Sequence, residues 1–324
     1  MEQRIRTRFT ERFAIAHPVM LAPMDKVAGG KLAGAVSQAG GLGLIGGGYG
    51  DAAWLERAFA EAGNAAVGVG FITWSVMRQP ALIEQALARR PAALMVSFGD
   101  GEEAVAAARA ASVPTIWQVH RLSQAEQALA AGVDVIVVQG QEAGGHGMDR
   151  GLTALLPAVR DLAGDGQIVL AAGGLADGRG LAAALMLGAD GVMLGTRFWA
   201  SREAEGSEAA KAALVGATGD QTLRSKVFDV ARNADWPWEF TGRTVDNAFS
   251  RQWHGDLEGL QRSFESERAR YDAADPDDYD IRVLIAGESL DLIREIAPAE
   301  MIVTDVVRQA ADLLGRAGGF LAAP

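Results

Sequence analysis

Short apolar runs recur along the chain up to residue 194, and glycine, proline or polar residues bound each of them. There are eight, at 18–22, 41–46, 66–71, 93–98, 113–119, 134–139, 167–172 and 190–194. Alanine-rich stretches of amphipathic character lie between them, at 30–39, 52–62, 79–89, 102–111, 123–131 and 179–187. Strands that alternate with helices in this way predict a parallel sheet with crossover helices.

Nearly all of these runs are apolar throughout, which is typical of strands that are buried on both faces. Eight such strands match the closed (β/α)8 TIM barrel, which is the fold class that we predict. An open doubly wound sheet is the competing topology. However, no Gly-x-Gly-x-x-Gly pattern opens the first unit, where a dinucleotide-binding sheet would have it. The nearest match, within 40–48, straddles the second predicted strand.

The pattern changes after Thr196. Residues 204–282 are more polar and aromatic, include Trp236, Trp238 and Trp253, and contain an acidic stretch near their end. We expect this segment to form an inserted, mainly helical lid domain. Beyond it, apolar residues recur at helical spacing between Val303 and Leu314, which predicts the last barrel helix. The barrel would then comprise residues 1–203 and 283–324.

Composition narrows the class of function. The 324-residue chain has a formal charge of -11, which argues against a general affinity for nucleic acid or anionic membranes. It contains no cysteine, so disulfides, thiolate nucleophiles and thiolate metal sites are excluded. Residues 1–13 lack the apolar core of a signal peptide, and no later run is as long as a membrane span. We therefore expect a cytoplasmic protein that acts on small molecules.

The polar residues most informative about chemistry follow the sixth predicted strand. Residues 139–147 read Gln-Gly-Gln-Glu-Ala-Gly-Gly-His-Gly, which places His146 on a glycine-rich turn at a strand end. Barrel enzymes have their active sites at this end of the strands, and an imidazole exchanges protons near neutral pH. His146 is therefore our candidate catalytic residue, and His120 is a weaker one. Glu142 is expected to orient the loop by accepting backbone hydrogen bonds.

Two further glycine turns predict a phosphate site. Gly173 and Gly174 end the seventh predicted strand, and the eighth ends in Met193, Leu194, Gly195 and Thr196. Backbone N–H groups in such turns can hold a phosphate without lysine. Each turn alone has a purely structural explanation, but their presence on adjacent strands favours a phosphorylated cofactor.

Other strand ends offer contacts for a ring system. Ala22, Pro23 and Met24 follow the first predicted strand and could lie flat against an aromatic ring, although a plain turn is the alternative. Gln118 and Gln139 could hydrogen-bond heterocycle edges or simply tie down a loop. Residues 236–243, Trp-Pro-Trp-Glu-Phe-Thr-Gly-Arg, could cap a pocket, form a subunit interface or pack within the lid.

Taken in order, residues 22–24, 139–147, 172–174 and 195–196 closely resemble the nitronate monooxygenase family, formerly called 2-nitropropane dioxygenases. Residues 236–243, 286–287 and 298–299 agree as well, so the resemblance spans nearly the whole chain. The Glu-Ala-Gly-Gly-His run is quite specific to this family and its near relatives, whereas many FMN barrels share the glycine pairs.

The resemblance implies non-covalently bound FMN, with its phosphate on Gly173, Gly174 and residues 193–196. It places residues 22–24, Gln139 and Gly144 near the flavin ring, and Gly145 and Gln118 complete the predicted cofactor-binding set. His146 matches the family's active-site histidine. In this family a nitronate reduces the flavin, and O2 then reacts to give a carbonyl compound and nitrite, without NAD(P)H.

One departure from the family pattern is visible, and several alternatives stay open. Gly70 stands where family members commonly have an asparagine that touches the flavin.

The imidazole of His146 suits either a nitronate, as a hydrogen-bond donor, or a nitroalkane, as a base. An NAD(P)H-dependent FMN reductase of the quinone reductase or enoyl-acyl-carrier-protein reductase type is the alternative enzyme, and a non-catalytic flavin-binding protein is the other alternative. A homodimer is compatible with the sequence.

Overall fold

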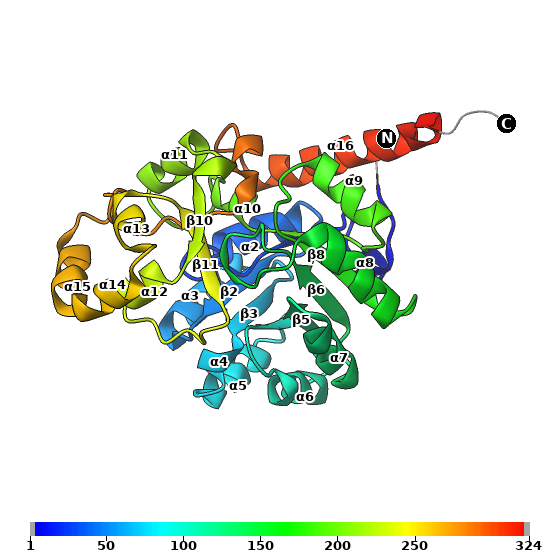
Figure 1. The fold of residues 1–324 in the computed structure, drawn as a ribbon. Coiled ribbons are helices and arrows are strands. Elements are labelled where there is room, and N and C mark those ends of the chain that lie inside the picture. The colour runs from blue at the N-terminus through cyan, green and yellow to red at the C-terminus, as the bar shows by residue number, and fades with distance from the viewer. Residues whose placement is uncertain (1–3, 321–324) are drawn as a thin grey trace.

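Each predicted apolar run contributes a strand to one parallel sheet in the computed structural model, which describes residues 4–320 (Figure 1). The strands are β1 (Val19–Leu21), β2 (Leu44–Gly48), β3 (Gly68–Ile72), β4 (Leu94–Ser97), β5 (Thr115–Val119), β6 (Val135–Gln139), β8 (Ile168–Ala172) and β9 (Val192–Leu194). Within these residues the order is β1-β9-β8-β6-β5-β4-β3-β2, and every pairing is parallel.

The sheet closes on itself between its first and last strands. Leu21 N donates to Leu42 O, and Leu42 N donates to Val19 O, each at 3.0 Å, just before β2 begins. A parallel bridge between Met20 and Leu42 accompanies these bonds. The predicted (β/α)8 barrel is therefore confirmed, and the open sheet is excluded.

Alternation along the strands divides the core into two layers, because successive side chains of a strand point to opposite faces. The inner layer fills the barrel and includes Met20, Met95 and Met193, joined by Phe9 of α1 (Arg8–Phe13). The outer layer packs between strands and helices and includes Leu194.

Helices surround the barrel where the alanine-rich stretches predict them. They are α2 (Gly30–Gln38), α3 (Ala52–Ala62), α5 (Pro80–Ala88), α6 (Glu102–Ala110), α7 (Leu122–Ala130), α8 (Leu152–Ala163) and α9 (Gly178–Met186). The predicted last helix is α16 (Ala299–Arg316), which packs against α9 and α2 and ends in η3 (Ala317–Phe320). Its Val303, Val306 and Val307 are buried in the outer layer. Two short helices, α4 (Thr73–Val76) and α10 (Thr196–Trp199), follow β3 and β9.

Between α10 and α16 the chain forms a separate group of elements beside the barrel (Figure 1). These are α11 (Glu208–Gly216), η1 (Gly219–Gln221), β10 (Thr222–Ser225), α12 (Val227–Ala231), β11 (Thr241–Val245), α13 (Ala248–Trp253), α14 (Leu257–Arg262), α15 (Phe264–Ala273) and η2 (Glu288–Leu292). A small hydrophobic core of their own includes Phe228, Phe249 and Tyr271.

The inserted elements pair with the histidine loop. Residues that the sequence places in a turn form a short strand instead, β7 (Gly145–Gly147), in the antiparallel sheet β10-β11-β7. Gly242 of β11 lies opposite His146 in this sheet. Backbone pairing thus connects the barrel loop that holds His146 to the insertion. Over residues 4–320, no helix is both long and apolar enough to cross a membrane.

Candidate active site

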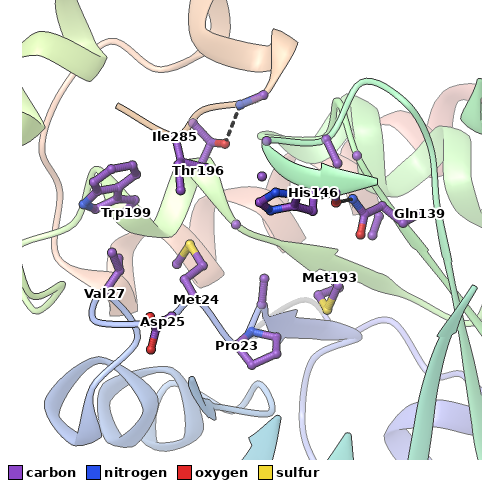
Figure 2. A pocket seen from close by; sticks show the side chains of 18 of the residues that line it. Pro23, Met24, Asp25, Val27, Gln139, His146, Met193, Thr196, Trp199 and Ile285 are labelled. Carbon is purple, nitrogen blue, oxygen red and sulfur yellow. Dashed lines mark hydrogen bonds between the residues drawn. The ribbon is translucent and has the colours of Figure 1, made fainter. Parts of the chain in front are cut away.

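A cavity of about 400 Å³ lies at the carboxyl ends of the barrel strands, and Arg232 and Trp236 of the insertion also line it. Its volume falls within the range of roughly 300–1,000 Å³ that is typical of small-molecule sites. All but one of the predicted site residues line it, namely Ala22, Pro23, Met24, Gln118, Gln139, Gly144, Gly145, His146, Gly173, Gly174, Met193, Gly195 and Thr196. In Figure 2, His146 faces Pro23 and Met193 across the cavity.

Leu194 is the exception among the predicted residues. Its side chain is 1% exposed and packs in the outer layer of the core, while Met193 faces the barrel interior and lines the cavity. The cause is strand alternation, since neighbouring residues of β9 point to opposite faces. Leu194 therefore offers a ligand its backbone at most.

The two predicted phosphate turns depend on glycine in different ways. Gly173 and Gly174 have φ angles of +103° and +69°, which side chains rarely adopt. A Cβ built at Gly195 would meet only the cavity-lining Ala22 Cβ, at 3.6 Å, and Met24 Sδ, at 3.7 Å. A side chain at position 195 would therefore occupy the cavity.

Thr196 connects this turn to a distant segment. Its Oγ1 accepts a hydrogen bond of 3.0 Å from Gly287 N, drawn as a dashed line in Figure 2. Gly287 and Ile285 also line the cavity. The segment that follows the insertion is therefore fixed over the predicted phosphate turn.

The unusual Gly70 of β3 is explained by its contact with Pro23. A Cβ at position 70 would lie 2.4 Å from Pro23 Cγ and 2.5 Å from Pro23 Cβ. Real side chains do not approach so closely, so the asparagine common in the family cannot fit here while Pro23 stays in place. Gly70 itself does not line the cavity, whereas Pro23 does.

Glutamine and glutamate side chains shape the histidine loop. Gln139 Nε2 donates to the backbone oxygen of His146 at 2.8 Å, so Gln139 ties down this loop in addition to lining the cavity. The carboxylate of Glu142 accepts from Leu152 N at 3.1 Å, which confirms the expected orienting role. Gln118 Nε2 lies 3.4 Å from Nε2 of His120.

The imidazole of His146 lies in a nearly closed environment. Its Nε2 is 2.9 Å from Oδ1 of Asp229, which α12 of the insertion supplies. Its ring stacks on the indole of Trp236, with centroids 3.4 Å apart and planes 6° apart. Burial lowers the pKa of His146 below its ordinary value, although the hydrogen bond and charge of Asp229 act in the opposite direction. The imidazole is therefore neutral at pH 7.

The other histidines do not line the cavity. His120 is buried and stacks on Phe98, and burial lowers its pKa to about 4. It is therefore a neutral structural residue, in agreement with its weaker candidacy. His17 is buried before β1, and His254 follows α13 on the insertion.

Trp236 caps the cavity, as one of the three interpretations of residues 236–243 predicts. Its ring contacts aromatic side chains of the barrel loops, including Tyr49, Trp74 and Phe98, at edge-to-face angles. Its Nε1 donates to the hydroxyl of Tyr49 at 2.7 Å. The packing is thus mainly against the barrel, and the indole is held firmly over the imidazole.

Sequence reasoning missed several charged and polar residues of this site. No local sequence pattern marks them. Tyr49, Asp25 and Arg232 line the cavity. Asp229 binds the imidazole of His146. Among the described residues, neither Asp25 nor Arg232 has a side-chain hydrogen bond or ion pair. Burial raises the pKa of Asp25, and the positive charges of Lys26 and Arg232 lower it. Arg232 therefore brings a positive charge to the cavity lining, where it acts on Asp25 and could also attract an anionic ligand.

Comparison with known proteins agrees with this architecture. The nitronate monooxygenase family model matches residues 6–66 and 53–309. The chain is 36% identical over 334 residues to the nitronate monooxygenase npaC of Metarhizium robertsii, covering 91% of both proteins. The structure of FabK from Thermotoga maritima superposes with a TM-score of 0.84 at 27% identity, covering 98% of this chain and 100% of that one.

A nitroalkane oxidase from Streptomyces ansochromogenes has a similar structure as well. It gives a TM-score of 0.75 at 26% identity and covers 95% of this chain and 99% of that one. The family match extends over most of the chain and includes both the barrel and the inserted elements. The chain therefore belongs to the nitronate monooxygenase family.

Proposed function

We propose that this enzyme is an FMN-dependent nitronate monooxygenase that oxidises alkyl nitronates with O2 to carbonyl compounds and nitrite. Family membership and the related structures indicate a flavin, and the proposal narrows this flavin to FMN. The observation that supports the proposal best is the arrangement of one cavity, in which the neutral imidazole of His146 faces strand ends that include two glycine turns.

The residues present fit FMN. The backbone N–H groups of Gly173, Gly174, Gly195 and Thr196 would hold its phosphate, because the missing side chain at position 195 leaves that part of the cavity open. Pro23, with its neighbours in 22–24, would lie along the ring system. A bound flavin supplies the redox chemistry, since it can take electrons from a nitronate and pass them to O2.

His146 would handle the proton. In its neutral form the imidazole can remove the α-proton of a nitroalkane, and the C–H electron pair then forms the C=N bond of the nitronate. In its protonated form it would donate a hydrogen bond to the nitro oxygens and stabilise their negative charge. Arg232, which also lines the cavity, would attract the nitronate anion.

The decisive experiment separates the two enzyme classes by their reductants. Purified protein should be yellow and should release FMN on denaturation. Mixed anaerobically with a nitronate, the flavin absorbance should bleach, and admission of O2 should then produce nitrite. Rapid bleaching by NADH or NADPH without bleaching by nitronates would overturn the proposal in favour of a reductase, and a colourless protein that takes up no added FMN would defeat both.

The cellular setting is part of the same proposal. The net charge of -11 and the absence of cysteine support a cytoplasmic enzyme whose partners are a small-molecule substrate and O2, with no nucleic acid or membrane involved. A homodimer remains the assembly to test, and sedimentation velocity of the purified protein would decide between one and two chains.

A further inference from the structure

We propose that Asp229 is a positioning residue that holds His146 in a single tautomer, with the proton on Nε2, and so makes Nδ1 the nitrogen that works on the substrate. This inference rests on the proposed role of His146 in nitronate chemistry. It assigns the inserted elements a part in the proton transfer in addition to covering the cavity.

The hydrogen bond between the two side chains sets the tautomer. Asp229 Oδ1 lies 2.9 Å from Nε2, and the two side chains are only 9% and 11% exposed. A carboxylate can only accept a hydrogen bond, so the proton must be on Nε2. In a neutral imidazole the other nitrogen, Nδ1, then has a free lone pair and is the base.

Stacking on Trp236 fixes the plane of the same ring. The two ring planes are within 6° of parallel, so a partial rotation of the imidazole about its Cβ–Cγ bond would break the stacking. A half-turn would keep the plane but would move Nε2 away from Asp229. The indole is itself anchored by its bond to the Tyr49 hydroxyl. Asp229 thus constrains the edge of the imidazole, and Trp236 constrains its face.

Lys226 connects these two constraints. Its side chain is buried, and its Nζ lies 3.4 Å from Oδ2 of Asp229. The same ammonium donates to the backbone oxygens of Trp236, at 3.3 Å, and Pro237, at 2.9 Å. A buried carboxylate needs such a counter-charge, and this lysine also ties the helix of Asp229 to the loop of Trp236.

Three charged groups of the insertion act on the imidazole. Asp229 raises the pKa of His146, whereas Lys226, Arg232 and burial lower it. The facing strand β11 contributes the uncharged Gly242, and the aromatic cap contributes Trp236. Removing the carboxylate therefore leaves only influences that lower the pKa of His146.

The test combines histidine NMR with kinetics on the FMN-loaded enzyme. Long-range ¹H–¹⁵N spectra of the wild type should show a protonated Nε2 and an unprotonated Nδ1 for His146, identified from the resonances lost in His146→Gln. In Asp229→Asn this single tautomer should be lost. With nitroethane as substrate, kcat/KM should fall about 10- to 100-fold, as for other residues that orient a catalytic group, and the pKa of its acid limb should move downward.

Asp235→Asn is the matched control, because Asp235 belongs to the same segment but its side chain is 80% exposed and, within residues 4–320, pairs only with Arg78 on the surface. It should leave spectra and kinetics unchanged. A wild-type spectrum with the proton on Nδ1 overturns the inference, even if Asp229→Asn does not fold. So does an Asp229→Asn enzyme with the wild-type tautomer and pH profile. If the wild type makes no nitrite but its tautomer depends on Asp229, the proposed function fails and the positioning role stands.

Discussion

The contact between Gly70 and Pro23 gives a sharp test of how the barrel shapes the cavity. In Gly70→Ala the new methyl group would lie 2.4 Å from Pro23 Cγ. Carbon atoms prefer separations of about 3.5–4.0 Å, so one of the two must move by about 1 Å. Pro23 lines the cavity while β3 is paired on both sides. We therefore expect the proline to move toward the flavin.

Overpacking of this kind costs about 1–3 kcal/mol, which corresponds to about 5- to 150-fold in an equilibrium constant. We expect most of this free-energy cost to appear as weaker cofactor binding, so the Kd for FMN should rise by about 5- to 150-fold. Any remainder should lower Tm by a few degrees. Gly70→Asn should be at least as severe, although it restores the residue that is common in the family.

The assay is a titration of the apoprotein with FMN, followed by quenching of flavin fluorescence, together with a thermal melt. Gly216→Ala serves as the control, since a Cβ there meets nothing within 4 Å and lies at the end of α11. If Gly70→Ala binds FMN and melts like the wild type, the contact with Pro23 does not shape the site and our explanation of the glycine is wrong.

Three further predictions follow from the cavity. Gly195→Val should fill the cradle and weaken FMN binding at least about tenfold, as a weak or colourless preparation would show, because overpacking there falls on the ligand; full FMN occupancy would contradict this. Because burial lowers the pKa of His146, kcat/KM for nitroethane should rise with pH through an apparent pKa below about 6.5 and level off above it; a midpoint above that value argues against the neutral base. Arg232→Gln should raise KM for a nitronate about tenfold with a smaller effect on kcat, and an unchanged KM in oxygen-consumption assays would remove Arg232 from anion binding.

The barrel was predictable from the sequence because its determinants are local. Each strand is an apolar run beside an amphipathic stretch, and eight such units match the number of strands in a closed parallel barrel. The location of the glycine turns and of His146 at one end of the barrel could be predicted as well, because parallel strands bring their carboxyl ends to one face. Alternation along β9 sends the Leu194 side chain outward, so only its backbone could take part in the predicted site.

The environment of His146 was not predictable in the same way. Asp229 lies 83 residues further along the chain than His146, in the short helix α12. Nothing in the sequence of this helix marks it as part of a site. The pairing of β7 with β11 also joins segments distant in sequence, and three residues of Gly-His-Gly have no strand pattern of their own. These contacts depend on how the insertion folds over the barrel, which no local periodicity encodes.

The most direct test of the central claim compares the wild type with His146→Ala, each loaded with FMN and supplied with nitroethane or a preformed nitronate under air. We predict one FMN per chain in both proteins, and nitrite formation from nitroethane that falls about 10²- to 10⁴-fold in the variant. Equal nitrite production by the two proteins from both substrates would contradict the account.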